Sequence, residues 1–273
     1  MPRCAQACAW GGGSIINAIA LGVGASFPIS LRVVAEVCES GEDSVSSYAD
    51  VDLSPIYRAL DVLRQRFKFG GVSVKFSGDL PTAGGLKSSS AALNSLILAL
   101  DELFELGLSR LDAARLNAEI SKAVGISVTG AFDDAVASAL GEAWLTDNGE
   151  NALLRRLDVS GDVLVLIPPW DRGRGRVEEM RAVAPAVRAA VLYALRGDWR
   201  TAMAINAIAY GFALGYDPAP TVEALRAGAV GGVSGTGPSH VFVAENAERL
   251  CPVLAGYGRL IRARIPDGPC AVT

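Results

Sequence analysis

Hydrophobic and polar residues follow two different periods along this chain, and together these periods predict a mixture of strands and helices. Over 72–77 every second residue is apolar, as expected for a strand with one buried face. Two further stretches, 31–38 and 163–167, also have the character of strands, and the second is apolar enough to be buried on both faces. Over 52–67 apolar residues recur every three or four positions, which is typical of an amphipathic helix. The pattern therefore predicts an α+β protein.

Capping residues predict where several helices begin. Ser54 is expected to cap the helix just described, with Pro55 at its first position. Ser109, followed by Asp112 three residues later, predicts a capping box for another helix. A third helix is expected to begin near Ser88. The remaining expected elements are helices over about 177–196, 199–214 and 247–262, a glycine-rich turn over 228–237 and a strand over 240–244.

The composition is that of a folded protein with one large domain or two smaller ones. The chain has 273 residues, of which 51% are hydrophobic and 20% are charged, far from the composition of a disordered chain. The expected elements fit two α+β halves that meet near residue 155, so we expect domains over 1–155 and 156–273. A net charge of −4 argues against nucleic acid as the principal partner. The sequence does not distinguish a monomer from a homodimer.

Two features predict a cytoplasmic protein. The apolar run over 15–29 is too short for a membrane-spanning helix and is interrupted by glycines and by Pro28. No basic segment precedes this run, so we expect neither a signal peptide nor a membrane partner. The five cysteines are scattered, and Cys4 and Cys8 have no second pair or nearby histidine to complete a zinc site. We therefore expect reduced, buried thiols.

The stretch L-P-T-A-G-G-L-K-S-S-S-A-A over 80–92 has the composition of a phosphate-binding loop. It lies between the strand over 72–77 and the helix expected from Ser88, so backbone N–H groups and the positive end of the helix dipole would point at a common anion. Lys87 adds a positive charge, and three serines offer hydroxyl oxygens to a phosphate group or to Mg²⁺. The spacing is not that of a P-loop, because Leu86 precedes the lysine in place of a glycine. The alternative is a loop before a helix with ordinary serine caps.

A second segment, S-V-T-G-A-F-D-D-A over 127–135, places two adjacent carboxylates at the start of a short helix that is expected to reach Leu140. Asp133 or Asp134 could accept a proton from a substrate hydroxyl. Acidic residues at this end of a helix could equally serve only as caps that complement the helix dipole.

The other candidate residues carry weaker signals. Glu119 could be a metal ligand, or the partner of Arg115 in an ion pair four residues away. His240, the only histidine, is expected to be structural. Glycine-rich segments over 10–14 and 231–238 are also present, and the second could be no more than a tight turn.

Together these segments resemble the GHMP kinases, a superfamily that phosphorylates small metabolites such as galactose, homoserine and mevalonate. The loop over 81–92 is similar to the second motif of that superfamily, P-x-x-x-G-L-G-S-S-A-A, but has a lysine at the third glycine and an extra serine. Those departures, with T-G-A-F-D-D-A and V-S-G-T-G-P, resemble the archaeal-type shikimate kinases. The resemblance covers nearly the whole chain, with 10–29 placed like the first motif. It implies a two-domain α+β fold, with an N-terminal half like domain 2 of ribosomal protein S5 and a ferredoxin-like C-terminal half.

The resemblance also implies an activity, the phosphorylation of the 3-hydroxyl of shikimate, with ATP and Mg²⁺ as cofactors. Lys87 would stabilise charge on the transferred group, and Asp133 would accept the proton of the hydroxyl or orient it. Mg²⁺ would be bound by Ser89 or Ser90 and, as a looser match, by Glu119. The turn over 235–238 would support the phosphate loop from the other half. The nucleotide phosphates would be bound by the loop residues Pro81, Thr82, Ala83, Gly84, Gly85, Leu86, Lys87, Ser88, Ser89, Ser90 and Ala91.

Three alternatives share these features. A GHMP kinase for another small alcohol, such as homoserine or a mevalonate-like compound, would keep the same phosphate loop, and a decarboxylase of this fold uses similar parts. A non-catalytic metabolite sensor would have no need of Lys87 and Asp133. The carboxylate of shikimate calls for an arginine, for which the basic cluster over 172–176 is a candidate, although a solvated loop is the simpler interpretation of that cluster.

Overall fold

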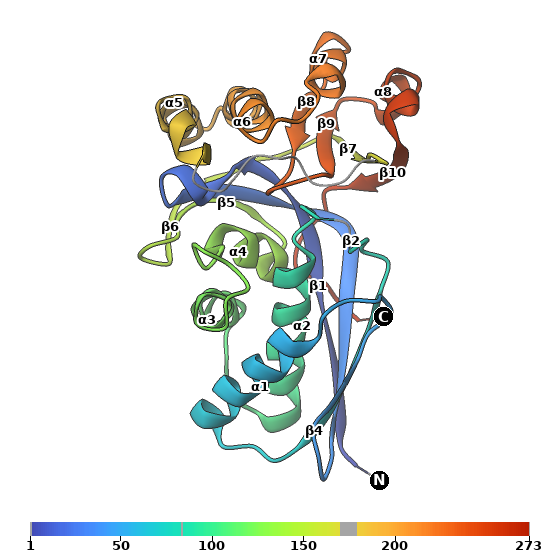
Figure 1. Cartoon of the computed structure of the whole chain (residues 1–273). Helices are drawn as coiled ribbons and strands as arrows, with labels where there is room; N and C mark the ends of the chain where they lie inside the picture. Colours follow the sequence, from blue (N-terminus) through green and yellow to red (C-terminus); the bar gives the residue numbers. More distant parts are fainter. Residues whose placement is uncertain (1, 83, 170–178, 273) are drawn as a thin grey trace.

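A computed structural model describes residues 2–82, 84–169 and 179–272, which form two β-sheets with helices packed against them (Figure 1). The strands of the first sheet are β1 (Cys4–Ile16), β2 (Val23–Glu39), β3 (Ser44–Ser46), β4 (Val72–Gly78), β5 (Ala143–Asp147) and β6 (Ala152–Leu157). Their order is β3-β4-β2-β5-β6, and β1 pairs with β2 in addition. The long β2 is the centre of this sheet, because it pairs with β1 over most of its length, with β4 near one end and with β5 near the other.

The first four helices lie together on one side of this sheet (Figure 1). They are α1 (Ser54–Phe67), α2 (Ser88–Phe104), α3 (Arg110–Ala123) and α4 (Phe132–Leu140). Both α2 and α4 contact β1 and β2 directly, while α3 packs on α2 and α4. Most of the surface of α2 is buried, which fixes the start of that helix firmly with respect to the sheet.

The helix starts agree closely with the capping signals. The capping box of Ser109 and Asp112 is confirmed, with each side chain accepting a hydrogen bond from the backbone N–H of the other residue. The expected start of a helix at Ser88 is confirmed as well. The expected cap at Ser54 is wrong, because Ser54 is already the first residue of α1. The N-cap position is Leu53, and the carboxylate of Asp52, one residue earlier, accepts from the backbone N–H of Ser54 at 2.9 Å.

The second sheet has the strand order β10-β7-β9-β8, with every neighbouring pair antiparallel. Its strands are β7 (Asp162–Ile167), β8 (Val230–Val233), β9 (His240–Ala244) and β10 (Arg259–Arg264), and its helices are α5 (Ala184–Leu195), α6 (Trp199–Ala213), α7 (Ala219–Arg226) and α8 (Ala247–Leu254). The helices lie along the outer side of this sheet (Figure 1). This strand order is that of a ferredoxin-like sheet, and the two sheets with their helices form a two-part α+β fold. The division after residue 155 stays a prediction; β6 runs across it, and the second sheet begins at Asp162.

Three of the expected elements differ from the structure. The turn expected over 228–237 contains the strand β8. Glycine allows this pairing, since a Cβ at Gly231 would lie 2.1 Å from the carbonyl oxygen of Val241 in β9. The helix expected over 247–262 ends at Leu254 and is followed by η3 (Ala255–Tyr257) and β10. The helix expected over 177–196 begins with the 3₁₀ turn η2 (Glu179–Val183) and continues as α5; residues 177 and 178 lie outside the described residues.

The apolar run over 15–29 belongs to the first sheet. Its residues form the end of β1, the 3₁₀ turn η1 (Ala18–Ala20) and the first part of β2, and side chains such as Ile15, Phe27 and Ile29 are fully buried in the core. Within the described ranges, none of the helices has the length and apolarity needed to cross a bilayer.

The expectation of reduced cysteines is wrong. Disulfides join Cys4 to Cys38 and Cys8 to Cys270, and only Cys251 is a free thiol. The first bond follows from strand register, because Cys4 in β1 is paired directly with Cys38 in β2. The second bond depends on the path of the C-terminal segment, which the local pattern of residues does not indicate.

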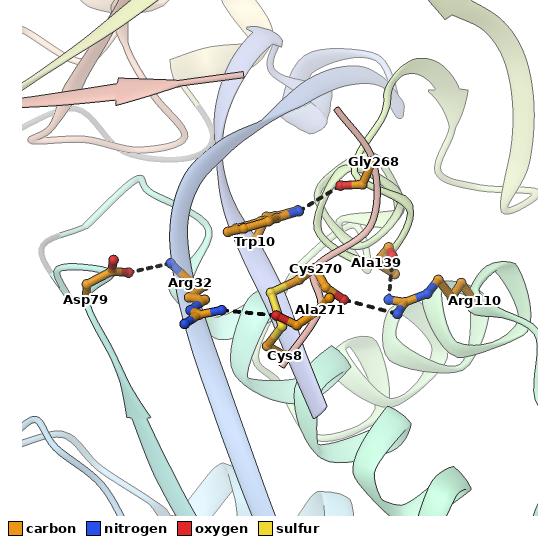
Figure 2. The surroundings of a disulfide bond; sticks show 9 residues. All are labelled: Cys8, Trp10, Arg32, Asp79, Arg110, Ala139, Gly268, Cys270 and Ala271. Atoms are coloured by element: carbon orange, nitrogen blue, oxygen red, sulfur yellow. Dashed lines mark hydrogen bonds between the residues drawn. A yellow bond between two sulfur atoms is a disulfide. The ribbon is translucent and has the colours of Figure 1, made fainter. Parts of the chain in front are cut away.

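The C-terminal segment lies against the first sheet and is held there by side chains from three elements (Figure 2). The indole N–H of Trp10 in β1 donates to the carbonyl oxygen of Gly268 at 2.9 Å. Arg32 in β2 donates to the carbonyl oxygen of Ala271 at 3.1 Å, and Arg110 in α3 donates to that of Cys270 at 3.2 Å. The C-terminal segment is therefore attached to β1 and β2, the two strands that also contribute residues to the site described below.

Candidate active site

A cavity of about 420 Å³ lies where the two halves of the chain meet. Its wall contains the start of α2, the start of α4 and the turn between β8 and β9, so the motifs noted in the sequence come together there. The turn contributes Gly235 and Thr236. The predicted site residues that line the cavity are Thr82, Gly84, Gly85, Lys87, Ser88, Ser89, Ser90, Asp133 and Asp134.

The start of α2 forms one end of this cavity, where the sequence predicts that an anion binds. Lys87 precedes the helix in a left-handed conformation, with φ of 64°, and no side chain in the described part of the chain caps the helix. The backbone N–H groups of Ser88, Ser89 and Ser90 therefore have no partner within the helix and face the cavity together with the positive end of the helix dipole. The side chain of Ser89 is exposed while that of Ser90 is buried, so the two candidate metal ligands differ in their access to a bound ion.

Other predicted loop residues support the cavity from outside its wall. Leu86 and Ala91 are fully buried in the core, and the carbonyl oxygen of Leu86 accepts a hydrogen bond of 3.0 Å from the N–H of Gly12 in β1. Pro81 is half-buried beside the cavity but does not line it. Ala83 lies outside the described residues.

The turn between β8 and β9 contacts the predicted phosphate loop through residues on either side of 235–238, the segment that the family resemblance implies. The hydroxyl of Ser234 donates to the carbonyl oxygen of Gly85 at 2.7 Å, and the N–H of Ser239 donates to that of Gly84 at 3.2 Å. Gly85 has φ of +104°, and a Cβ there would lie 2.1 Å from the carbonyl oxygen of Ser234. Only glycine permits so close an approach of the two halves.

Two contacts hold Lys87 in the wall of the cavity. Its ammonium group donates to the hydroxyl of Ser14 at 2.8 Å and lies 2.9 Å from a carboxylate oxygen of Asp134. Ser14 in turn accepts from the N–H of Gly235 at 3.0 Å, which connects the glycine-rich segment of β1 to the turn of the other half. Of the described residues that line the cavity, Lys87 is the one cationic side chain.

Asp133 is buried at the start of α4, with 4% of its surface exposed. Asn148 donates to one of its carboxylate oxygens at 2.7 Å, and the hydroxyl of Ser26 in β2 lies 3.1 Å from the other. Burial, and after it the negative charge of Asp134, raises the pKa of Asp133 to about 7, against the opposing effects of Lys87, Asn148 and Ser26. A carboxyl group with this pKa can gain or lose a proton near neutral pH, as a general base requires.

The structure does not bring Glu119 to the other site residues. Its side chain is exposed on α3, does not line the cavity and pairs with Arg66 at 3.0 Å, whereas Arg115 pairs with Asp112. Across the described parts of the chain, no group of three or more acidic, histidine or cysteine side chains is placed to hold a metal ion.

His240 has the structural position expected of it. It is fully buried in β9, and burial lowers its pKa to about 4, so it is neutral at physiological pH.

Several residues of the site were not found from the sequence. Ser26 and Asn148 hold Asp133, but isolated serines and asparagines carry no local signal of such a role. Ser14, which holds Lys87, lies in the glycine-rich segment over 10–14, whose signal in the sequence was weak. The apolar part of the wall comes from Tyr48, Val51 and further residues before and at the start of α1. The hydroxyl of Tyr48 donates to the carbonyl oxygen of Leu80 at 2.6 Å, which links this wall to the phosphate loop.

Comparisons with known proteins agree with this geometry. Residues 54–142 match the family model "GHMP kinases N terminal domain". A shikimate kinase of Methanothrix thermoacetophila is 38% identical over 271 residues, which cover 96% of this chain and 93% of the relative. A shikimate kinase of Pyrococcus abyssi is 35% identical over 260 residues, covering 91% of this chain and 94% of the relative.

Solved structures show the same fold at low sequence identity. Galactokinase of Lactococcus lactis in complex with galactose has a TM-score of 0.74 and 13% identity, with 99% of this chain and 95% of that chain covered. Mevalonate kinase of L. major in complex with R-mevalonate has a TM-score of 0.71 and 14% identity, with 99% and 98% covered. The family match, the relatives and the fold together define a small-molecule kinase of the GHMP class. Within that class, the chain belongs to the shikimate kinase family.

Proposed function

We propose that this protein transfers the γ-phosphoryl group of ATP to the 3-hydroxyl of shikimate. The observation that carries the proposal is that Lys87, the uncapped start of α2 and the buried Asp133 all face one cavity. Phosphoryl transfer depends on positioning and charge stabilisation more than on covalent chemistry, and the cavity offers both. The acceptor is inferred from the relatives, which match nearly the whole chain and are named shikimate kinase.

The cavity has separate regions for the two ends of a nucleotide. The phosphate groups would be bound by the N–H groups at the start of α2 and by the ammonium group of Lys87. The base would lie against the apolar wall that contains Tyr48, Val51 and Pro55, since flat apolar groups favour such surfaces. Leu86 and Ala91 would keep the loop in place from the core.

Asp133 would act on the acceptor. As the bond from the shikimate oxygen to the γ-phosphorus forms, the bond between that phosphorus and the bridging oxygen of ADP breaks, and its electron pair stays on ADP. The proton of the shikimate hydroxyl passes to the carboxylate of Asp133. Asn148 holds the carboxylate in position through its 2.7 Å hydrogen bond.

The cavity also fits Mg²⁺, which prefers a few hard oxygen ligands together with phosphate oxygens and water. The hydroxyls of Ser88, Ser89 and Ser90 lie at the anion-binding end, and Ser89 or Ser90 would hold the ion. The ion would neutralise negative charge on the phosphate groups. Glu119 does not fit this role, because its carboxylate pairs with Arg66 away from the cavity.

The ligand of the shikimate carboxylate stays a prediction. The arginine cluster over 172–176 lies outside the described residues.

A kinase of another small alcohol, such as homoserine, would use the same phosphate site, and a metabolite sensor would bind without turnover. The ion pair and buried carboxyl at the site favour a catalytic protein, since binding alone requires neither a general base nor its costly burial.

We also propose a cytoplasmic location, where ATP is available. The two disulfides would then have to persist in a reducing compartment, as disulfides do in intracellular proteins of hyperthermophiles. The oligomeric state is not part of the proposal.

One experiment separates these functions. ADP release is measured with Mg-ATP and, in turn, shikimate, homoserine, mevalonate and galactose. We expect release with shikimate, and much slower release for Asp133→Asn, whose affinity for ATP should be retained. Release with homoserine alone would overturn the choice of acceptor, and no release with any acceptor would favour the sensor.

A further inference from the structure

Two side chains of α6 hold the turn η1, which joins β1 to β2. Asn206 and Tyr210 are one helical turn apart, so they point in the same direction, and both are buried. The side-chain oxygen of Asn206 accepts from the backbone N–H of Asn17 at 2.8 Å. The hydroxyl of Tyr210 donates to the carbonyl oxygen of Asn17 at 3.0 Å and accepts from the N–H of Ala20 at 3.1 Å. Three hydrogen bonds from the second half of the chain therefore hold both ends of the turn.

The hydroxyl of Tyr210 is a permanent donor near neutral pH. Burial, opposed by the hydrogen bond from Ala20, raises the pKa of Tyr210 to about 12, and the negative charge of Asp133 acts in the same direction as burial. The effect of Asp133 indicates that the tyrosine lies near the catalytic carboxyl group. Neither Asn206 nor Tyr210, however, is among the described residues that line the cavity. Any influence of these side chains on the reaction must therefore act through η1.

The turn η1 forms the wall of the cavity beside Asp133. Asn17, Ala18 and Ile19 all line the cavity. A Cβ at Gly24 would lie 2.7 Å from a carboxylate oxygen of Asp133 and 2.8 Å from the methyl group of Ala18, so the turn and the carboxyl group flank the same point of β2. An acceptor whose hydroxyl gives its proton to Asp133 would therefore lie against η1.

The phosphate end of the cavity is supported by other contacts. The hydrogen bonds from Ser234 and Ser239 to the phosphate loop come from the turn between β8 and β9 and not from α6. Asn17 connects this turn to η1, because its side chain donates to the carbonyl oxygen of Gly235 at 2.8 Å. That bond uses the side chain of Asn17, whereas α6 holds its backbone. The contacts from α6 can therefore be removed separately.

We propose that Asn206 and Tyr210 are positioning residues that set the affinity for the acceptor by holding η1 beside Asp133. Without their hydrogen bonds, backbone groups of the turn would either stay inside the protein without a partner or move to reach water. Either change alters the acceptor end of the cavity and leaves the support of the phosphate end in place. This inference rests on the proposed phosphoryl transfer, and it adds that a helix of the second half determines how the acceptor binds beside a base of the first half.

The first test compares Tyr210→Phe with Tyr193→Phe. Each variant loses one hydroxyl and keeps the ring, and Tyr193, exposed on α5, is the matched control. We expect Tyr210→Phe to raise KM for shikimate about 10-fold, as for the loss of a buried hydrogen-bonding group, while KM for ATP stays within about two-fold. Tyr193→Phe should change neither constant. An equal rise for both substrates in Tyr210→Phe, or an unchanged KM for shikimate, would overturn the proposal.

A second variant tests whether the two side chains act on the same turn. Asn206→Leu removes the acceptor of the Asn17 N–H with little change in volume, and it should also raise KM for shikimate. In the double variant with Tyr210→Phe, the rise should be smaller than the product of the two single effects, because the second loss acts on a turn that is already released. A full product would mean that the residues act independently, and η1 would be rejected as their common target.

Hydrogen exchange provides a measurement that does not depend on turnover. The backbone N–H groups of Asn17 and Ala20 donate to the two side chains of α6, so their exchange rates report these hydrogen bonds directly. By mass spectrometry, we expect a peptide covering 17–22 to exchange faster in Tyr210→Phe than in the wild-type protein. A peptide covering 84–90, in the phosphate loop, should exchange at an unchanged rate.

The proposed function and this inference fail in different ways. If the wild-type protein releases ADP only with another acceptor, the choice of shikimate fails, whereas a rise in KM for that acceptor alone in Tyr210→Phe still supports the role of α6. If ADP is released with shikimate but exchange over 17–22 is unchanged in Tyr210→Phe, the inference fails and the proposed function stands.

Discussion

The ammonium group of Lys87 and the carboxylate of Asp134 lie 2.9 Å apart, and both side chains are largely withdrawn from solvent. Their elements are distant in the sequence, since Lys87 precedes α2 and Asp134 is the third residue of α4. Such a pair is costly to break on one side only, because the remaining charge is then buried without a partner. Loss of either partner should therefore lower the stability of the folded protein as well as its activity.

Replacement of this lysine should impair both activity and stability. For Lys87→Met we expect kcat/KM for ATP to fall at least about 100-fold, as when a group that stabilises transition-state charge is removed. The melting temperature should also fall, because Asp134 loses its counter-charge. Lys75→Met, on the exposed side of β4, is the matched control and should change neither quantity. Equal behaviour of the two variants in steady-state kinetics would contradict the role of Lys87.

The raised pKa of Asp133 predicts a dependence of stability on pH. The folded protein keeps this group protonated up to about pH 7, whereas the unfolded chain loses the proton near the ordinary value of 3.8. The stabilising contribution is thus fully present below the unfolded value and is lost as pH rises through 7. Urea unfolding at pH 5 and pH 8 should show a larger loss of stability for the wild-type protein than for Asp133→Asn. Equal losses would mean that Asp133 is already ionised at pH 5.

The position of Glu119 predicts a variant without effect on catalysis. Glu119→Gln should leave kcat and the concentration of Mg²⁺ needed for half-maximal activity within about two-fold of the wild-type values, because the lost pair with Arg66 is exposed and contributes little. Titration of activity with MgCl₂ checks this. A large increase in the required Mg²⁺ would show that α3 rearranges and that Glu119 reaches the ion.

The disulfide between Cys8 and Cys270 should contribute strongly to stability, since it joins residues 262 positions apart. For Cys270→Ser we expect the free energy of unfolding to fall by about 2 to 5 kcal/mol. Cys251→Ser, which removes the free thiol, is the control and should have little effect. Chemical denaturation with and without reductant measures both, and reductant should destabilise the wild-type protein more than Cys270→Ser. Identical curves for wild-type protein and Cys270→Ser would mean that this bond does not form.

Local signals in the sequence identify much of the fold. The start of α2, the capping box of α3 and the strand β9 depend on a few neighbouring residues, and each was predicted correctly. The loop over 80–92, most of which lines the cavity, could be singled out for the same reason, because small residues, a lysine and a helix start are adjacent in the chain. The strands β5 and β6 carried no such signal, and the repeated glycines of β8 indicated a turn rather than a strand.

The parts that could not be predicted depend on distant contacts. Ser14, Ser26 and Asn148 contact the charged groups only after β1, β2 and the turn after β5 have come together. Glu119, by contrast, was predicted to belong to the site but lies away from the cavity. Its chemistry suits a metal ion, but the face of α3 on which it lies is set by the packing of that helix, and this face is turned to solvent. The disulfide to Cys270 likewise depends on a contact across nearly the whole chain.

The hydrogen bonds from Ser234 and Ser239 to the phosphate loop have a consequence for how the protein melts. The loop belongs to the first sheet and its helices, yet part of its support comes from the turn of the second sheet. Neither half can unfold without disturbing the loop, so a nucleotide bound at the predicted site would stabilise both halves by the same free energy of binding. In calorimetry the two halves should melt as a single cooperative unit when nucleotide is bound.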